Sequence, residues 1–121
     1  MAQQQTEYNR KGDEAMRRQD YRMATMWYEE GVIQCDSYSI DQLTTIWKNN
    51  KKMRSSMRSL MSRCFDCLRD KATIESDTTA ISQLIHYYTE GIGTQANEER
   101  ARSWSNRLGE LRRPMELVSY I

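Results

Sequence analysis

Residues 12–36 read GDEAMRRQDYRMATMWYEEGVIQCD. Small residues recur in this stretch where two helices would touch, and aromatic residues recur where a gap between helices must be filled. The small residues are Gly12, Ala15, Ala24 and Gly31, and the aromatic ones are Tyr21, Trp27 and Tyr28. This pattern is typical of a helical hairpin that stacks on similar hairpins. It therefore predicts an all-α chain built from repeated helix pairs.

Working outward from this stretch, we expect one helix on each side of a turn at Gln19 and Asp20. The helices are expected over residues 6–18 and 21–35, because their small and apolar residues are spaced three and four apart. Asp20 is the expected N-cap of the second helix, since its carboxylate can accept from the unpaired amides of the first turn.

A second helix pair is expected over residues 39–75. Ser39 and Gln42 have the spacing of a capping box, which predicts a helix from Ile40 to about Lys52. A further helix is expected over residues 56–69, with a buried stripe of Met57, Leu60, Met61, Cys64, Cys67 and Leu68. A break near residues 54–56 is inferred from the repeat. No Gly or Pro marks it, so one long helix over residues 40–70 stays open.

A third helix pair is expected over residues 76–113. Asp77 and Asn97 are the expected N-caps of its helices, and glycines at 91 and 93 are expected to end the first of them. The last helix is expected to bury Ala101, Trp104, Leu108 and Leu111. Pro114 should stop it. The apolar tail, residues 114–121, would pack as a cap or begin a further repeat.

The first pair, over residues 5–38, resembles the tetratricopeptide repeat. The resemblance is carried by Gly12, Tyr21 after Asp20, Ala24, Tyr28 and Gly31. It departs at Lys11, Ala15 and Asp36, where the family usually has Leu, an aromatic residue and Pro. The third pair resembles the related Sel-one-like repeat at Tyr87, Tyr88, Glu90, Gly91, Gly93, Ala101 and Trp104. These resemblances imply three stacked helix-turn-helix units, about six helices, that form one domain over residues 1–121 as a short right-handed α-solenoid.

The charge of the chain is balanced, with 18 Lys and Arg against 17 Asp and Glu. The balance hides a basic block, because residues 39–72 carry eight basic and three acidic side chains. Its main members are Lys48, Lys51, Lys52, Arg54, Arg58 and Arg63. Such a run usually forms a solvated helix face. Recognition of an acidic protein segment is favoured next, and nucleic-acid binding less, because no aromatic residue is interleaved for base stacking.

The three cysteines are Cys35, Cys64 and Cys67. The last two have a metal-site or redox-site spacing, but only Cys35 and His86 could complete a zinc site that needs about four ligands. We interpret the cysteines as packing residues and predict no metal and no cofactor. Their odd number, together with the absence of an apolar N-terminal run, predicts a reducing, cytoplasmic location. No apolar stretch is long enough to span a membrane.

The predicted function is a non-enzymatic protein–protein interaction scaffold. His86 is the single histidine, and no nucleophile motif accompanies it. By resemblance, the first helices of the units line a concave groove that holds a peptide or protein segment, expected to be acidic. The implied lining residues are Asn9, Asp13, Arg17, Thr44, Lys48, Lys52, Ser82, His86 and Thr89. Two alternatives stay open: nucleic-acid binding through the basic block, and a structural repeat segment of a longer protein.

Overall fold

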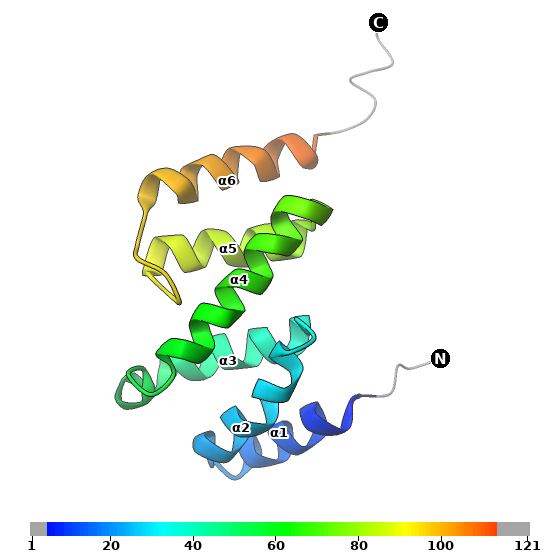
Figure 1. The fold of residues 1–121 in the computed structure, drawn as a ribbon, viewed down its shortest axis with the longest axis vertical. Helices are drawn as coiled ribbons and strands as arrows, with labels where there is room; N and C mark the ends of the chain where they lie inside the picture. The colour runs from blue at the N-terminus through cyan, green and yellow to red at the C-terminus, as the bar shows by residue number, and fades with distance from the viewer. Residues whose placement is uncertain (1–4, 114–121) are drawn as a thin grey trace, which may run out of the picture. The chain divides into compact units, whose positions relative to one another are not determined.

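The computed structural model describes residues 5–113, and within them the chain is all-helical, without a β-strand (Figure 1). The predicted all-α class is confirmed. The α-helices are α1 (Glu7–Arg17), α2 (Tyr21–Val32), α3 (Ser37–Asn49), α4 (Arg58–Glu75), α5 (Thr78–Glu90) and α6 (Glu98–Leu111). A 3-10 helix, η1 (Lys51–Met53), follows α3. None of these helices is both long and apolar enough to cross a membrane.

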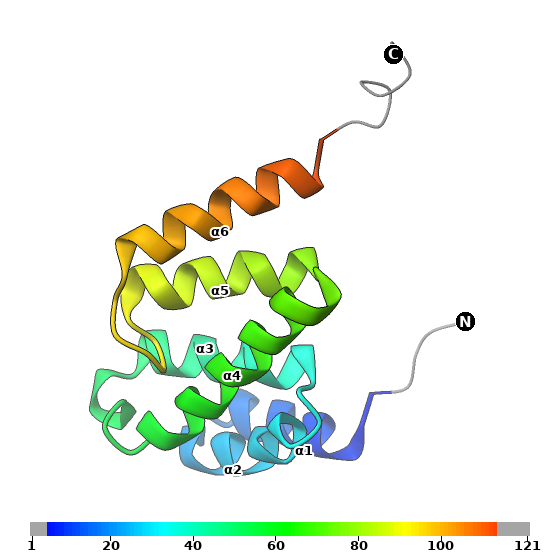
Figure 2. The same cartoon turned by 45° about the horizontal axis from the view of Figure 1, so that its top comes forward.

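The chain divides into two compact units, with the boundary between Cys67 and Leu68. The first unit contains α1, α2, α3, η1 and the beginning of α4, and the second contains the end of α4 together with α5 and α6. Figure 2 shows the antiparallel pair of α5 and α6 in the second unit. The single domain expected over residues 1–121 stays a prediction.

The same turn recurs before α2, α3 and α5. In each turn a non-glycine residue takes a left-handed conformation, with φ of 61° at Gln19, 51° at Cys35 and 51° at Ser76. The residue after it is an aspartate, Asp20, Asp36 or Asp77, whose carboxylate accepts from an amide in the first turn of the next helix. The left-handed residue ends one helix and the aspartate begins the next, so a very short connection suffices. The predicted caps Asp20 and Asp77 are therefore confirmed.

The predicted start of the second helix pair is wrong. Asp36, not Ser39, caps α3, and its carboxylate accepts from the Ser39 amide at 3.0 Å. Ser39 lies inside the first turn of α3 and is completely buried. The capping-box pattern misplaced the start because the true cap stands three residues earlier, at the position where the resembled repeat usually has Pro.

A break between the third and fourth helices is confirmed, but it spans residues 50–57 and begins earlier than the predicted residues 54–56. The chain leaves α3 at Asn50, whose φ of −132° and ψ of 80° are not helical, and it resumes as α4 at Arg58. The guanidinium of Arg54 lies 3.9 Å from the ring centroid of Trp47 and donates to the carbonyl oxygens of Trp47 and Lys48 at 2.8 and 3.0 Å. Arg54 thus satisfies carbonyls that the end of α3 leaves unpaired.

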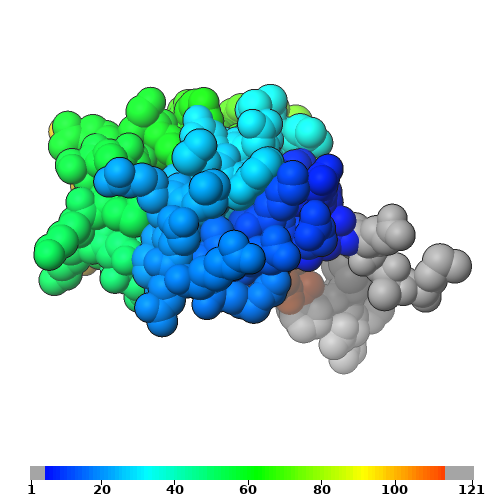
Figure 3. Space-filling model, turned by 90° about the horizontal axis from the view of Figure 1, so that it is seen from below, coloured from blue at the N-terminus to red at the C-terminus, as the bar shows by residue number. Residues whose placement is uncertain are grey.

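The hairpin of α1 and α2 packs through its small residues, and its outer face is seen in Figure 3. Ala24 and Tyr28 are completely buried. A Cβ atom placed on Gly12 would lie 2.5 Å from Cε1 of Tyr28. A Cβ atom on Gly31 would lie 2.6 Å from Cβ of Ser39 and 2.9 Å from Cε1 of Tyr8. The small residues are therefore required by the close approach of their neighbours, as the sequence predicted.

In the second unit, α5 ends at Gly91, which has a φ of 73°, and Asn97 caps α6 by accepting from the Arg100 amide at 3.0 Å. Both features were predicted. The expected inner stripe of α6 is covered only at its beginning, because Ala101 is buried whereas Trp104 and Leu108 are half-buried. Leu111 is 37% exposed. The predicted stop at Pro114 and the tail lie outside the described residues.

Candidate functional site

The predicted lining residues of the first unit have unequal exposure. Arg17, Lys48 and Lys52 are exposed, and Asp13 is half-buried. Asn9 and Thr44 are buried, with 3% and 9% of their surface exposed. These last two side chains are not open to a ligand, which corrects the prediction that Asn9 and Thr44 line a binding surface.

Asn9 belongs to a buried polar network that joins α1 to the start of α3. Its Nδ2 donates to Oδ2 of Asp36 at 2.9 Å, and its Oδ1 lies 2.7 Å from the hydroxyl of Ser39. The Ser39 hydroxyl also lies 2.8 Å from Asp36 Oδ2, so its one proton is shared between these two acceptors. Each polar group in the network has a partner, which is what burial of such groups requires. The network is therefore structural, and it explains why an aspartate at position 36 is suited to this chain.

Thr44 is structural in the same sense. Its hydroxyl donates to the carbonyl oxygen of Ile40, one turn earlier in α3, at 2.7 Å. A threonine hydroxyl that bonds back to its own helix is satisfied without any ligand.

Asp13 is the acceptor of a second polar cluster, around α1. Its Oδ2 accepts from Nε2 of Gln5 at 2.6 Å and from the Tyr38 hydroxyl at 2.8 Å, and its Oδ1 accepts from the hydroxyl of Tyr28. Burial raises the pKa of Asp13, but these hydrogen bonds and the charge of Arg17 outweigh burial, so the pKa lies below its ordinary value. Burial and the bond to Asp13 raise the pKa of Tyr28, which remains a donor.

This cluster predicts a specific pH dependence for the Asp13→Asn variant. Because the folded pKa of Asp13 is lowered, its ionisation stabilises the fold above the unfolded pKa of about 4, and this stabilisation is lost as pH falls through the folded pKa. At pH 7 we expect the variant to lose about 1 kcal/mol of unfolding free energy, since the cluster is partly screened by water. The loss should shrink below about pH 4.

Urea unfolding of wild type and Asp13→Asn at several pH values measures this effect. Tyr38→Phe is the matched control, because it removes one donor and keeps the carboxylate. A difference between wild type and Asp13→Asn that is the same at pH 3 and pH 7 would contradict the assignment.

Lys48 and Lys52 do not lie on one helix, although the sequence predicted a single helix from Ile40 to about Lys52. Lys48 is in the last turn of α3, whereas Lys52 is in η1, after the break at Asn50. Both are exposed. Both positive charges are nevertheless on the surface of the first unit.

Two other members of the basic block, Arg54 and Arg63, make contacts within the first unit. Arg54 covers the end of α3, as described above. Arg63 on α4 pairs with Glu29 on α2 at 3.3 Å. Lys11 lies outside the basic block, at a position where the resembled repeat has Leu. Its ammonium group lies 4.4 Å from the Trp27 ring centroid and 3.4 Å from a Glu7 carboxylate oxygen. Its aliphatic stem can cover part of the apolar surface that a leucine would fill, while the charge stays in water.

The predicted lining residues of the second unit, Ser82, His86 and Thr89, all lie on α5. Their spacing of four and three residues places them on one face of the helix. The His86 side chain is 62% exposed, and its Nδ1 lies 3.8 Å from a carboxylate oxygen of Glu90. Ser82 is half-buried, and Thr89 is exposed and donates to the Ile85 carbonyl at 2.8 Å.

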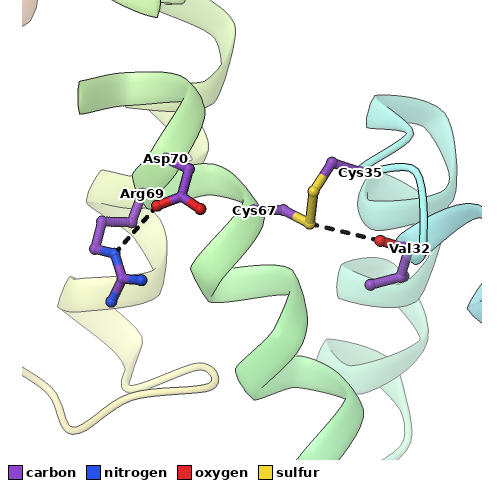
Figure 4. Close-up of a disulfide and its surroundings, with 5 residues drawn as sticks. All are labelled: Val32, Cys35, Cys67, Arg69 and Asp70. Atoms are coloured by element: carbon purple, nitrogen blue, oxygen red, sulfur yellow. Dashed lines mark hydrogen bonds and ion pairs between the residues drawn. A yellow bond between two sulfur atoms is a disulfide. The ribbon is translucent and has the colours of Figure 1, made fainter. Parts of the chain in front are cut away.

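The interpretation of all three cysteines as packing thiols is wrong for two of them. Cys35 and Cys67 form a disulfide, with Cα atoms 5.4 Å apart (Figure 4). Cys64 is a buried thiol. Disulfides are rare in reducing compartments, so the cysteines no longer favour the predicted reducing location. Within the described residues, no three His, Cys, Asp or Glu side chains gather where they could hold a metal ion. The absence of a cofactor stays a prediction.

The sequence analysis did not suggest the disulfide or the capping role of Asp36. The disulfide joins residues 32 positions apart, and nothing in the spacing of Cys64 and Cys67 points to Cys35. The aspartates had a visible signal, because Asp20, Asp36 and Asp77 each stand shortly before an expected helix.

In comparisons with known proteins, no family model, no curated protein and no solved structure matches this chain.

Proposed function

We propose that this chain is a non-enzymatic protein-interaction module of the tetratricopeptide or Sel-one-like kind, whose helix pairs stack as a short right-handed α-solenoid. The observation that carries the proposal is the fit of Gly12 against Tyr28 and of Gly31 against Ser39 and Tyr8. Small residues at these positions are what the register of such a repeat requires. Repeats of this kind present extended surfaces to protein segments.

The proposed partner is a protein segment rich in Asp and Glu. Among the proposed lining residues of the first unit, the exposed ones are the cations Arg17, Lys48 and Lys52. The carboxylate of Asp13 is occupied by internal hydrogen bonds from Gln5, Tyr28 and Tyr38. A cationic surface attracts an acidic ligand, chiefly by raising the association rate and by rejecting basic competitors.

The proposal predicts that Lys48→Glu/Lys52→Glu weakens binding of an acidic peptide roughly tenfold or more. The peptide would come from display selection against the purified protein, and its affinity would be measured by fluorescence anisotropy. We expect the melting temperature to stay nearly unchanged, because both lysines are exposed. Arg22→Glu/Arg102→Glu is the matched control, since it makes the same change of charge at exposed residues outside the proposed lining.

Equal loss of affinity in both double variants would show a general charge effect and would remove Lys48 and Lys52 from the site. Selection of peptides without acidic residues would overturn the proposed partner class. Tight binding of an arbitrary single-stranded DNA with a steep salt dependence would instead favour a nucleic-acid surface over the basic block.

A further inference from the structure

The Cys35–Cys67 disulfide connects a turn to a helix within the first unit. Cys35 occupies the left-handed position between α2 and α3, and Cys67 lies in the interior of α4 (Figure 4). The connected residues are 32 positions apart. A crosslink that closes a loop of this length restricts the unfolded chain strongly.

We propose that this disulfide is a redox site, opened and closed reversibly by thiols, that controls how firmly the first part of α4 is held. Opening it leaves α1, α2 and α3 folded and increases the local opening of residues 58–67. The proposal does not depend on the function proposed above.

The turn at Cys35 does not need the disulfide in order to form. Gln19 has the same left-handed conformation, and the amide of the next residue, Asp20, donates to the Ala15 carbonyl at 2.9 Å. At the second turn the Asp36 amide donates to the Gly31 carbonyl, also at 2.9 Å. The first of these turns contains no cysteine, so backbone hydrogen bonds and an aspartate cap are sufficient for this conformation. What the disulfide adds is the connection to α4.

The start of α3 is also held independently of the disulfide. Asp36 caps α3, and Asn9 and Ser39 bind the same carboxylate from α1 and α3. These bonds join α1 to α3 and involve no sulfur atom. Reduction therefore leaves the contacts among the first three helices in place.

The connection between α4 and α2 depends more on the disulfide. The Arg63–Glu29 pair joins these helices at 3.3 Å, but both side chains are about half exposed, at 47% and 49%. An exposed ion pair contributes little to stability. The apolar face of α4, which includes Leu60, Met61 and Cys64, is buried and keeps the helix packed on average. Loss of the crosslink should therefore make α4 open more often without detaching it.

The structure already holds a partner for one of the thiols that reduction would create. Sγ of Cys67 lies 3.6 Å from the carbonyl oxygen of Val32, at the end of α2 (Figure 4). A disulfide sulfur carries no proton and cannot donate, whereas a thiol is a weak donor. Once the Cys35 sulfur has moved out of bonding distance, the reduced Cys67 can thus donate to Val32, which reduces the cost of burying it.

The chemistry is ordinary thiol–disulfide exchange with a small-molecule thiol as the reductant. Its thiolate attacks Sγ of Cys35, the more exposed of the two cysteines, and Cys67 leaves as a thiolate that takes up a proton. A second molecule of thiol then attacks the mixed disulfide and releases the Cys35 thiol. Two thiols are oxidised to one small-molecule disulfide, and one protein disulfide is reduced to two thiols. Oxidised glutathione reverses the sequence.

The test is amide hydrogen exchange of the oxidised protein and of the protein reduced with glutathione. We expect exchange in residues 58–67 to accelerate at least tenfold on reduction, within a limit on the order of 10²- to 10³-fold set by loop closure. Exchange in α1 and α2 should change by less than about threefold. Reoxidation should restore the original rates, and mass spectrometry of the oxidised protein should identify a Cys35–Cys67 peptide.

Two variants complete the test. Cys67→Ser should show the fast exchange of the reduced protein under both conditions. Cys64→Ser, which changes the neighbouring buried thiol, should keep the difference between oxidised and reduced protein. Reduction of the wild-type protein requires no variant, so the test stands if Cys67→Ser does not fold.

Three results would overturn the proposal: three thiols in the oxidised protein, exchange that accelerates as much in α1 as in α4, or loss of helical circular dichroism on reduction. The last would show a disulfide that the fold requires.

Discussion

Replacing Gly31 with alanine is expected to destabilise the first unit by about 2–3 kcal/mol, because the added methyl group has no space. It would lie 2.6 Å from Cβ of Ser39 and 2.9 Å from Cε1 of Tyr8, and still closer to the Ser39 hydroxyl. Ser39 cannot yield easily, because its hydroxyl and amide are both bonded to Asp36. The new atom therefore strains the contact between α2 and α3 and the network that caps α3.

Gly109→Ala is the matched control for this prediction. Gly109 lies in α6 of the second unit. Apart from its chain neighbours and the backbone of its own helix, a Cβ atom there would meet no atom of residues 5–113 within 4 Å. Because alanine is the better helix former, this variant should be more stable by about 0.5–1 kcal/mol. Urea unfolding of the two variants measures the contrast. Similar changes in both would show that Gly31 does not make the close contact described here.

The second large effect is expected for Asp36→Ala, with a loss of about 2–4 kcal/mol. The change removes the N-cap of α3, which is typically worth about 1 kcal/mol. It also takes an acceptor from the Nδ2 group of Asn9 and from the Ser39 hydroxyl, both of which lie in buried residues. A buried donor left without a partner costs about 1–3 kcal/mol.

Asp20→Ala separates the two parts of this effect. Asp20 caps α2 with the same type of bond, from the Met23 amide at 3.1 Å, but it is exposed and has no buried network behind it. We expect this variant to lose only about 1 kcal/mol. Thermal and urea unfolding of the pair would measure the difference. Equal losses would mean that the Asn9–Asp36–Ser39 network contributes nothing beyond the cap.

The Asn9–Asp36–Ser39 network explains one departure from the repeat pattern, the aspartate at position 36. Position 36 was noted as a place where the resembled repeat has Pro, and nothing local said why an aspartate should stand there. Its reason lies 27 residues away, in the amide of Asn9 on α1. Likewise, Asn9 has the spacing of a surface residue on a first helix, but the proximity of Asp36 and Ser39 turns it into a buried one.

The sequence by itself determined the helical class, most helix boundaries, and the caps at Asp20, Asp77 and Asn97. It also determined the need for small residues at Gly12, Ala24 and Gly31. These features follow from the 3.6-residue period and from side chains that bond within one turn, so residues close in sequence suffice to predict them. The break between α3 and α4 could only be inferred from the repeat, because it is made by an ordinary asparagine and covered by Arg54.

Only the tertiary structure decided the pairing of Cys35 with Cys67, the burial of Asn9 and Thr44, and the separate placement of Lys48 and Lys52. The disulfide and the Asn9 contacts join residues 27 to 32 positions apart, and helical periodicity contains no information about which such residues meet. Periodicity assigns a residue to a face of its own helix. The packing of whole helices against one another decides whether that face meets solvent, an apolar neighbour or another polar side chain.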